Sequence, residues 1–196
     1  MKLVSRIKPL VFAASLVAST VALAASGDFV VNADANSTGG GVGVATFALL
    51  AGQQFSVSVA ANDLWNAGDL PRWSNADGLA GDLFYAAGTD SEVPVYAIGT
   101  QIGQAFSQLT QGGLTAAYGS LVGQIDSGSF FKIGTSYSGT AAVGGTLKLY
   151  YFDSINSDNT GSISAHVTAV PEPETYAMLV AGLSLLGGIY RRRKQK

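Results

Sequence analysis

Short runs in which apolar and polar residues alternate occupy the middle of the chain and restrict what it can fold into. Residues 53–60 are the clearest case, because Phe55, Val57 and Val59 share one face of an extended segment while serines take the other. The other runs with strand character are residues 42–49, 121–125, 130–133, 146–152 and 162–170. Residues 126–129 (Asp-Ser-Gly-Ser) are typical of a turn. This pattern predicts an all-β fold, an antiparallel β-sandwich or jelly roll.

Two of the later runs also predict which side chains are buried. These are Leu147, Leu149 and Tyr151 in one run, and Ile163, Ala165 and Val167 in the other. Residues 82–118 carry a weaker pattern, which favours either a helix near residues 102–109 (IGQAFSQL) or a long functional loop.

The N-terminus carries an export signature that lies outside this fold. A basic start precedes a mostly apolar stretch, residues 9–23, and Ala22-Leu23-Ala24 is a small-x-small cleavage site. The basic residues are Lys2, Arg6 and Lys8. Residues 1–24 are therefore interpreted as a secretory signal peptide, with the mature chain beginning near Ala25. A retained N-terminal anchor is the alternative.

The C-terminus consists of three consecutive parts. Pro171-Glu172-Pro173 is extended, because proline fixes φ and lacks an N–H. Residues 176–190 carry no charge and favour a helix, which at about 1.5 Å per residue spans roughly 22 Å and needs snorkelling side chains to bridge a ~30 Å hydrocarbon core. Arg191-Arg192-Arg193 and a lysine follow, on the cytoplasmic side by the positive-inside rule. We expect a transmembrane helix here; a buried C-terminal helix is the alternative.

This tail resembles the PEP-CTERM sorting signal of Gram-negative bacteria. The residues that carry the resemblance are Pro171, Glu172, Pro173, the pairs Gly182-Leu183 and Leu186-Gly187, and Arg191, Arg192 and Arg193. The resemblance implies cleavage by a membrane-embedded exosortase near the Pro-Glu-Pro motif, in addition to signal peptidase cleavage at the other end. It also implies export through the inner membrane, transient anchoring by the helix, and delivery to the cell envelope, the outer surface or an exopolysaccharide (biofilm) matrix.

The remaining domain, residues 25–170, is acidic and lacks cysteine. Its eleven acidic residues stand against only Arg72, Lys132 and Lys148, which gives a net charge of −8. This balance excludes electrostatic binding of nucleic acid, which needs Lys and Arg surfaces, and suits divalent cations or neutral sugars. Because no disulfide can form, stability depends on the core and on any bound metal.

Catalytic candidates are few. His166 is the only histidine, and its place in the last predicted strand favours a surface or hydrogen-bonded histidine over a general base. No serine lies in a Gly-x-Ser-x-Gly elbow, and a cysteine nucleophile is absent. The spacing of the acidic residues selects no pair for glycoside hydrolysis. The sequence therefore predicts a protein that is not an enzyme.

One polar loop stands out between the last two predicted strands. Residues 153–161 (DSINSDNTG) bring together side-chain oxygens of Asp153, Asn156, Asp158 and Asn159. Calcium takes roughly six to eight oxygen ligands, main-chain carbonyls included, so a loop of this composition suits one ion. The pattern is not that of an EF-hand. From the residues alone, a metal-free hairpin loop is the favoured alternative.

The stretch 121–167 resembles the galactose-binding-domain-like family that includes the calcium-dependent galactophilic lectin A of pseudomonads. The residues that carry the resemblance are 121–125, 131–134, 145–149, Asp153 and 158–162, with 55–60 and 65–68 upstream. It implies a jelly-roll sandwich with calcium at one end. Carried over from the family, the ligands are the main-chain carbonyls of Trp65 and Asn156 and the side chains of Asp153, Asp158 and Asn159. The loop is shorter than in the family, and Phe152 replaces a residue that is usually polar.

Sugar binding is a further implication of this resemblance. In the family, vicinal sugar hydroxyls complete the calcium shell, here beside Asp153 and Asp158, and a histidine and a glutamine hold the ring. His166 lies in the wrong strand to be that histidine. The candidates for an apolar platform under the sugar are Trp65, Trp73, Phe84 and Tyr85. Core or loop packing is the alternative role of these aromatic side chains.

Three functions follow from these observations. The first is a calcium-dependent carbohydrate-binding module associated with exopolysaccharide, with galactose-type glycans as partners. The second is a structural envelope or matrix protein with the same fold and no sugar site. The third and least favoured is a glycan-active enzyme.

Overall fold

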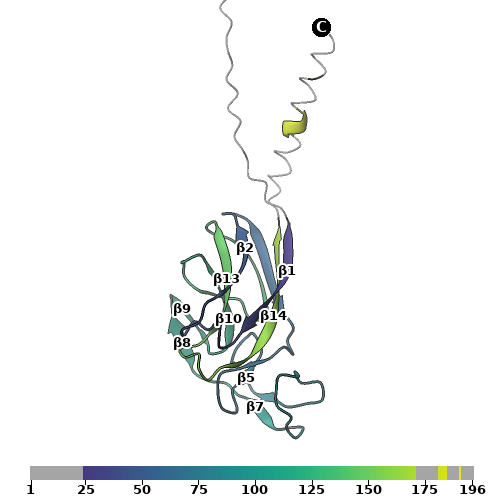
Figure 1. The fold of residues 1–196 in the computed structure, drawn as a ribbon, viewed down its shortest axis with the longest axis vertical. Helices are drawn as coiled ribbons and strands as arrows, with labels where there is room; N and C mark the ends of the chain where they lie inside the picture. Colours follow the sequence, from purple (N-terminus) through teal and green to yellow (C-terminus); the bar gives the residue numbers. More distant parts are fainter. Residues whose placement is uncertain (1–23, 171–180, 185–189, 191–196) are drawn as a thin grey trace, which may run out of the picture.

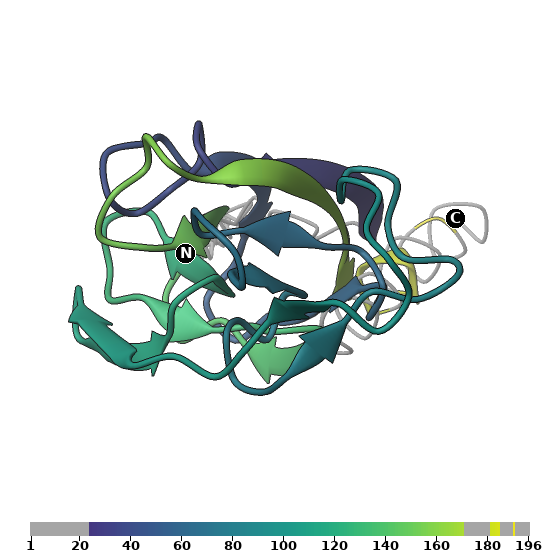
Figure 2. The ribbon, with the colours of Figure 1, turned by 90° about the horizontal axis from the view of Figure 1, so that it is seen from below.

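The computed structural model describes residues 24–170, 181–184 and 190. Residues 24–170 form an all-β unit in which two larger antiparallel sheets face each other (Figures 1 and 2). The predicted all-β class is confirmed. The strands are β1 (Ala25–Asn32), β2 (Val44–Leu49), β3 (Gln54–Val59), β4 (Trp65–Asn66), β5 (Trp73–Ser74), β6 (Leu83–Phe84), β7 (Gln101–Gly103), β8 (Gln108–Gln111), β9 (Leu114–Ala117), β10 (Ser120–Ile125), β11 (Phe131–Lys132), β12 (Ser136–Thr140), β13 (Gly145–Phe152) and β14 (Thr160–Val170).

Strand β14 organises the first sheet. β1 pairs along one edge of it, from Ala25 opposite Ala169 to Asn32 opposite Ser162, and β3 pairs along the other edge. β12 extends the sheet beyond β3, while β4 and β5 continue it from the first residues of β14. The side chains of β14 that face the second sheet are buried, and they are Ile163, Ala165, Val167 and Ala169. The burial predicted from alternation in this strand is therefore confirmed.

The second sheet has the order β11-β10-β13-β2. Strand β13 turns Leu147, Leu149 and Tyr151 inward, as their alternation predicts, and all three are completely buried. They join Phe55 and Val57 of the first sheet in one hydrophobic cluster. Burying a large apolar side chain contributes about 1.5–3 kcal/mol, so this shared core is the main source of stability for a domain without disulfides.

Residues 82–118 contain no helix, so the helical alternative near residues 102–109 is wrong. The segment instead supplies β6 to β9, which form two two-stranded sheets, β6 with β7 and β8 with β9. Gly103 lies against the main chain of Trp73, where any Cβ would clash, and it pairs in β7. Gly112-Gly113 takes positive φ values of 56° and 84° and closes the turn between β8 and β9. Backbone approach and turn geometry therefore override the helical spacing of the apolar residues.

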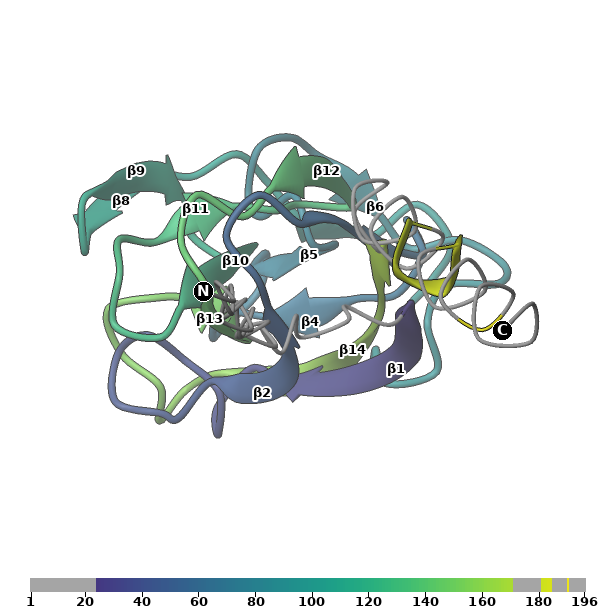
Figure 3. The ribbon, with the colours of Figure 1, turned by 90° about the horizontal axis from the view of Figure 1, so that it is seen from above.

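The two ends of the domain lie side by side at one end of the sandwich (Figures 1 and 3). The loop between β13 and β14 lies at the opposite end, because β14 runs from that loop to Val170. The predicted signal peptide and the predicted sorting segment fall outside the described residues, apart from Ala24, residues 181–184 and Tyr190. Within the described part of the chain, no helix has both the length and the apolar character needed to span a membrane. The transmembrane helix stays a prediction.

Candidate functional site

The polar loop that joins β13 to β14, residues 153–159, is the candidate site. It packs against two segments that are remote from it in sequence: the loop at residues 33–41, after β1, and the segment at residues 65–68, which contains β4. The domain thus gathers three polar segments at the end of the sandwich that lies away from Val170.

The loop at residues 33–41 holds the candidate site by direct hydrogen bonds. Thr38 Oγ1 donates to the main-chain carbonyl of Asp153 at 2.8 Å and accepts the main-chain N–H of the same residue at 3.0 Å. Asn156 Nδ2 donates to Asp34 Oδ1 at 3.1 Å. A Cβ added to Gly39 would lie 2.5 Å from a main-chain nitrogen of residues 153–159, so only glycine permits this approach.

The segment at residues 65–68 lies against the other side of the loop. β4 pairs with the first two residues of β14, directly after the loop. Gly68 has a φ of +113°, and a Cβ there would lie 2.9 Å from Asp158 Oδ2. The structure therefore brings the Trp65 segment beside the loop, as the proposed ligand set requires.

Two side chains form the buried polar centre of the loop. Asp153 is 5% exposed and Asn159 is 4% exposed. The amide nitrogen of Asn159 donates to the carbonyls of Ala33, at 3.3 Å, and Ile155, at 2.9 Å. Its Oδ1 is buried and has no hydrogen-bond partner. A buried acceptor without a donor costs about 1–3 kcal/mol, so this oxygen is available to a donor or a cation.

Burial and nearby charges also shift the pKa values of two ionisable groups at the loop. Burial raises the pKa of Asp153, and the nearby charge of Asp158 adds to that effect, while main-chain donors such as the Ile155 N–H and the Arg72 charge oppose it. Burial also raises the pKa of Tyr151 well above its usual value, and both carboxylates reinforce the shift. A divalent cation beside Asp153 would offset the burial and the nearby Asp158 charge that raise its pKa.

The residues present suit calcium better than a transition metal. Among the residues described, no group of three or more His, Cys, Asp or Glu side chains is arranged to hold a metal ion. Amide and main-chain oxygens must therefore supply much of any coordination shell, which is the chemistry that calcium accepts. Of the predicted ligands, Asp153 and Asn159 are buried, Asp158 is exposed, and the Asn156 carbonyl accepts the Asn159 N–H at 3.1 Å. Which atoms bind an ion stays a prediction.

The predicted aromatic platform is wrong for two of its four members. Trp65 is completely buried, stacks edge-on against Tyr151 with ring centroids 4.5 Å apart, and donates from Nε1 to the Gly119 carbonyl at 2.8 Å. Trp73 is 4% exposed and packs in a second hydrophobic cluster. Neither indole ring is free to stack on a sugar, because Trp65 lies in the core between the sheets and Trp73 lies in the second cluster. Phe84 is 53% exposed.

A separate cavity of about 260 Å³ lies beside β5. Its lining includes Trp73, Ser74, Asn75, Asp77 and Asp82 and contains no residue of the candidate loop. The carboxylate of Asp77 is already engaged, because it accepts hydrogen bonds from the N–H and the hydroxyl of Thr135 at 3.0 and 2.9 Å. This cavity is distinct from the predicted site.

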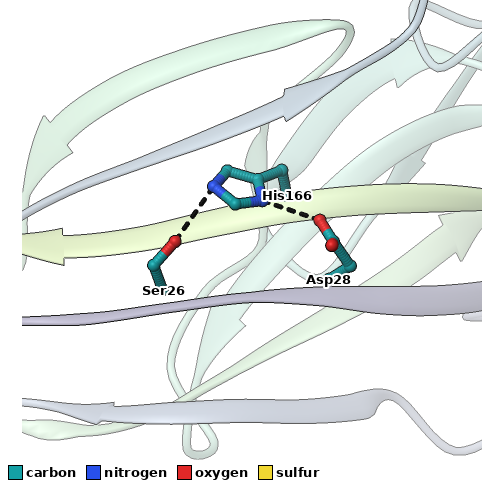
Figure 4. A network of polar contacts seen from close by, with 3 residues as sticks. All are labelled: Ser26, Asp28 and His166. Carbon is teal, nitrogen blue, oxygen red and sulfur yellow. Dashed lines mark hydrogen bonds and ion pairs between the residues drawn. The ribbon is translucent and has the colours of Figure 1, made fainter.

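His166 lies on the outer face of the first sheet, as expected of a surface strand histidine (Figure 4). Its Nδ1 lies 2.6 Å from Asp28 Oδ1, and its Nε2 lies 3.0 Å from Ser26 Oγ. This order of contacts is that of a Ser-His-Asp triad. However, the side chain of His166 is 50% exposed and that of Asp28 is 70% exposed. The main-chain groups around them are used in the pairing of β1 with β14. The network therefore links β1 to β14 on an exposed face of the sheet.

Other carboxylates of this acidic domain serve the main chain. Glu92 accepts the Ser162 N–H at 2.7 Å, and Asp63 accepts the Ser164 N–H at 2.7 Å, where β14 lies between its pairings with β4 and β3. Burial raises the pKa of Asp63, and the charges of Asp90 and Glu92 add to it. These acids complete a strand edge and form no additional ligand site.

The supporting residues of the loop at residues 33–41 carried little signal in the sequence. The stretch reads Asn-Ala-Asp-Ala-Asn-Ser-Thr-Gly-Gly-Gly from Asn32, which is typical of any polar turn. Its importance for the candidate site depends on long-range packing. Only the run of three glycines hinted at a close approach of main chains.

Comparison with known proteins identifies the tail. Residues 169–194 match the PEP-CTERM protein-sorting motif, which confirms the interpretation of that segment. Such signals mark proteins that are exported and sorted to the cell envelope or the extracellular space, and they imply processing by an exosortase. No curated protein matches the sequence. Among solved structures, the chain is similar to "EclA N-terminal domain; PllA-like lectin", with 21% identity and a TM-score of 0.43 over 74% of this chain and 95% of that one.

Proposed function

We propose that this exported protein carries a calcium-dependent carbohydrate-binding module that works in the cell envelope or an exopolysaccharide matrix. The observation that supports it most is the buried, unpartnered Oδ1 of Asn159 in the same loop as the buried carboxylate of Asp153. Two chain segments remote in sequence close around this loop. An ion there would satisfy the oxygen and relieve the raised pKa of Asp153.

The calcium shell in this proposal comes from the loop and its neighbour. Asp153, Asp158 and Asn159 supply side-chain oxygens, and Trp65 and Asn156 supply main-chain carbonyls. When bound, the ion would neutralise the paired carboxylates and offer open coordination positions to vicinal hydroxyls. Asp158 is exposed, so the site opens to solvent on that side of the loop.

The sugar in this proposal is a neutral glycan of the galactose type. The domain carries a net charge of −8, which disfavours acidic polysaccharides at close range. With both tryptophans buried, Ile155 is the large apolar side chain of the loop itself, and it is 56% exposed. Its contact with a sugar face would be small. We therefore expect weak, multivalent binding in place of a deep sugar pocket.

A structural matrix protein is the second candidate, and the burial of Trp65 and Trp73 favours it. Such a protein would keep the same loop, with or without calcium, and would not retain sugar. The two candidates differ in one measurable property, the retention of the domain on immobilised glycan in calcium compared with chelator.

The test uses residues 25–170, because every strand pairing and all three hydrophobic clusters lie within that range. Calcium is first titrated into the domain by calorimetry, and the domain is then passed over galactose-bearing resin with calcium or with EGTA. Calcium binding together with calcium-dependent retention supports the module. Calcium binding without retention on any neutral glycan supports the structural protein. If no heat of binding is measured at millimolar calcium, the proposed metal site is wrong.

A further inference from the structure

The end of the sandwich where the chain begins and ends carries exposed apolar side chains. Leu50 is 39% exposed in the turn between β2 and β3, Val143 is 57% exposed in the turn between β12 and β13, and Val170 is 45% exposed at the end of β14. Ala51 and Ala142 beside them are exposed as well. These five residues are called the apolar end.

Strand register places the members of the apolar end together. Val170 pairs with Gln54 at the start of β3, and Gln54 pairs with Thr140 at the end of β12. The two turns are bonded to each other, because the Gly52 N–H donates to the Ala141 carbonyl at 2.8 Å. The apolar end is therefore a fixed surface made of adjoining turns.

Charge is distributed unequally between the two ends. Residues 48–54 and 138–147 contain no charged residue. Asp126 is nearby, and its carboxylate accepts the Thr146 N–H at 2.8 Å. The opposite end carries the candidate site with Asp34, Asp153 and Asp158. The two turns of the apolar end are therefore uncharged, whereas the candidate site is acidic; Asp126, and Glu172 and Glu174 further along the chain, lie outside these turns.

We propose that the apolar end rests on the lipid surface of the membrane in which the chain is anchored before sorting. The chain continues from Val170 with Pro171-Glu172-Pro173, followed soon by the uncharged residues 176–190 and a basic cluster. Only five residues, 171–175, separate Val170 from this uncharged stretch, so a membrane-inserted tail would keep the apolar end within roughly 20 Å of the bilayer. Partial burial of exposed apolar turns in the interface is favourable and is helped by the absence of charge.

The proposal fixes the orientation of the domain. β14 has eleven residues, and at about 3.3 Å per residue it separates the apolar end from the candidate site by roughly 33 Å. The candidate site then faces away from the membrane while its opposite end contacts lipid. This inference does not depend on calcium or sugar binding, so its failure and that of the proposed function are separable.

The test uses the chain from Ala25 to Lys196, reconstituted in vesicles of phosphatidylethanolamine and phosphatidylglycerol. The protein has no cysteine, so Val143→Cys and, as a control at the other end, Ser154→Cys each give one site for an environment-sensitive fluorophore. We expect a blue-shifted emission at position 143 and quenching by spin-labelled lipid several-fold stronger than at position 154. Adding Leu50→Glu should remove the quenching at position 143 without lowering the melting temperature, because Leu50 is partly exposed.

Two results would overturn the proposal. Equal or absent lipid quenching at positions 143 and 154 would show that the apolar end does not contact the bilayer. A blue shift at position 143 that appears without vesicles and grows with protein concentration would show that a second copy of the chain covers this surface instead. Calcium titration of the same labelled proteins reports separately on the candidate site.

Discussion

Replacing Asp153 by asparagine should change the stability of the domain in opposite directions with and without calcium. The substitution keeps an acceptor for the Ile155 N–H, which Asp153 Oδ1 accepts at 3.2 Å, and replaces the other carboxylate oxygen by a neutral amide NH2. Asp153 is 5% exposed, so its ionised form is poorly solvated in the folded state. In chelator at neutral pH we therefore expect Asp153→Asn to melt at the same temperature as the wild type or higher.

Calcium should reverse this order. A ligand present at about one hundred times its dissociation constant stabilises the folded state by about 2.7 kcal/mol through mass action. For a domain of this length, each kcal/mol raises the melting temperature by about 2–4 °C, so calcium should raise that of the wild type by roughly 5–11 °C. Asp153→Asn lacks a charged ligand and should gain little. Differential scanning fluorimetry measures the melting temperatures of the wild type and of Asp153→Asn, each in calcium and in EGTA.

The pH dependence of the domain's stability follows from the raised pKa of Asp153. The pKa of Asp153 is raised in the folded state, so its contribution to stability is fully present below the unfolded pKa and is lost as the pH rises through the folded pKa. In chelator, the advantage of Asp153→Asn should therefore grow as the pH rises above the unfolded pKa and be complete above the folded pKa of Asp153. Calcium affinity of the wild type should fall as the pH is lowered through that value, because protons compete with the ion.

Asp126→Asn is the matched control for this experiment. Its carboxylate also accepts one main-chain N–H, that of Thr146 at 2.8 Å, but it lies at the opposite end of the sandwich. The calcium-dependent rise should be intact in this variant. If Asp153→Asn lost stability equally in calcium and chelator, Asp153 would be a purely structural hydrogen-bond acceptor, and the reasoning would be refuted.

Three further predictions test the packing around the site and the surface networks. Gly39→Ala places a Cβ 2.5 Å from the main chain of residues 153–159 and should cost about 1–3 kcal/mol in urea unfolding, whereas Gly81→Ala, with no atom within 4 Å, should be near neutral. Equal costs would show that the approach of Gly39 to the loop is unimportant. His166→Ala should change the unfolding free energy by less than about 1 kcal/mol, because its pairing with Asp28 is solvent-exposed. Hydrolysis of an activated ester that required both His166 and Ser26 would contradict the non-catalytic interpretation of this network. Relative to the wild type, Asp63→Asn should raise the melting temperature more at neutral pH than at acidic pH, because the raised pKa of Asp63 makes its ionised form unfavourable in the fold. If the difference in melting temperature between the two proteins did not change with pH, this reasoning would be wrong.

Alternation was sufficient to predict strands whose inner side chains are large. Phe55, Val57 and Val59 in β3 and Leu147, Leu149 and Tyr151 in β13 carry enough apolar volume to mark one face. β12 escaped prediction because its run Ser-Tyr-Ser-Gly-Thr has one large side chain and is a strand only through pairing with β3. β1 escaped because it begins directly after the predicted cleavage site. Its stability depends on β14, which lies at the other end of the sequence.

For the candidate site, the sequence indicated the polar loop but not the segments that pack against it, and the ligands stay a prediction. The loop composition indicated Asp153, Asp158 and Asn159, because their oxygens are local in sequence. The roles of the other segments depend on packing, and the burial of Trp65 and Trp73 shows the limit of composition. An aromatic residue near a polar loop serves either the core or a ligand, and only the sheet geometry decides between them.

The structure also suggests why such a site would suit a domain without disulfides. The segments that meet at the site come from near Ala33, Trp65 and Asp153, so their contacts close long loops of the chain. The unfolded chain holds no preformed set of these oxygens, and the free energy of calcium binding would therefore add to the stability of the folded state. The ion would thus act as a reversible cross-link between β4 and the loop that joins β13 to β14. Unlike a disulfide, this link would respond to the calcium concentration outside the cell.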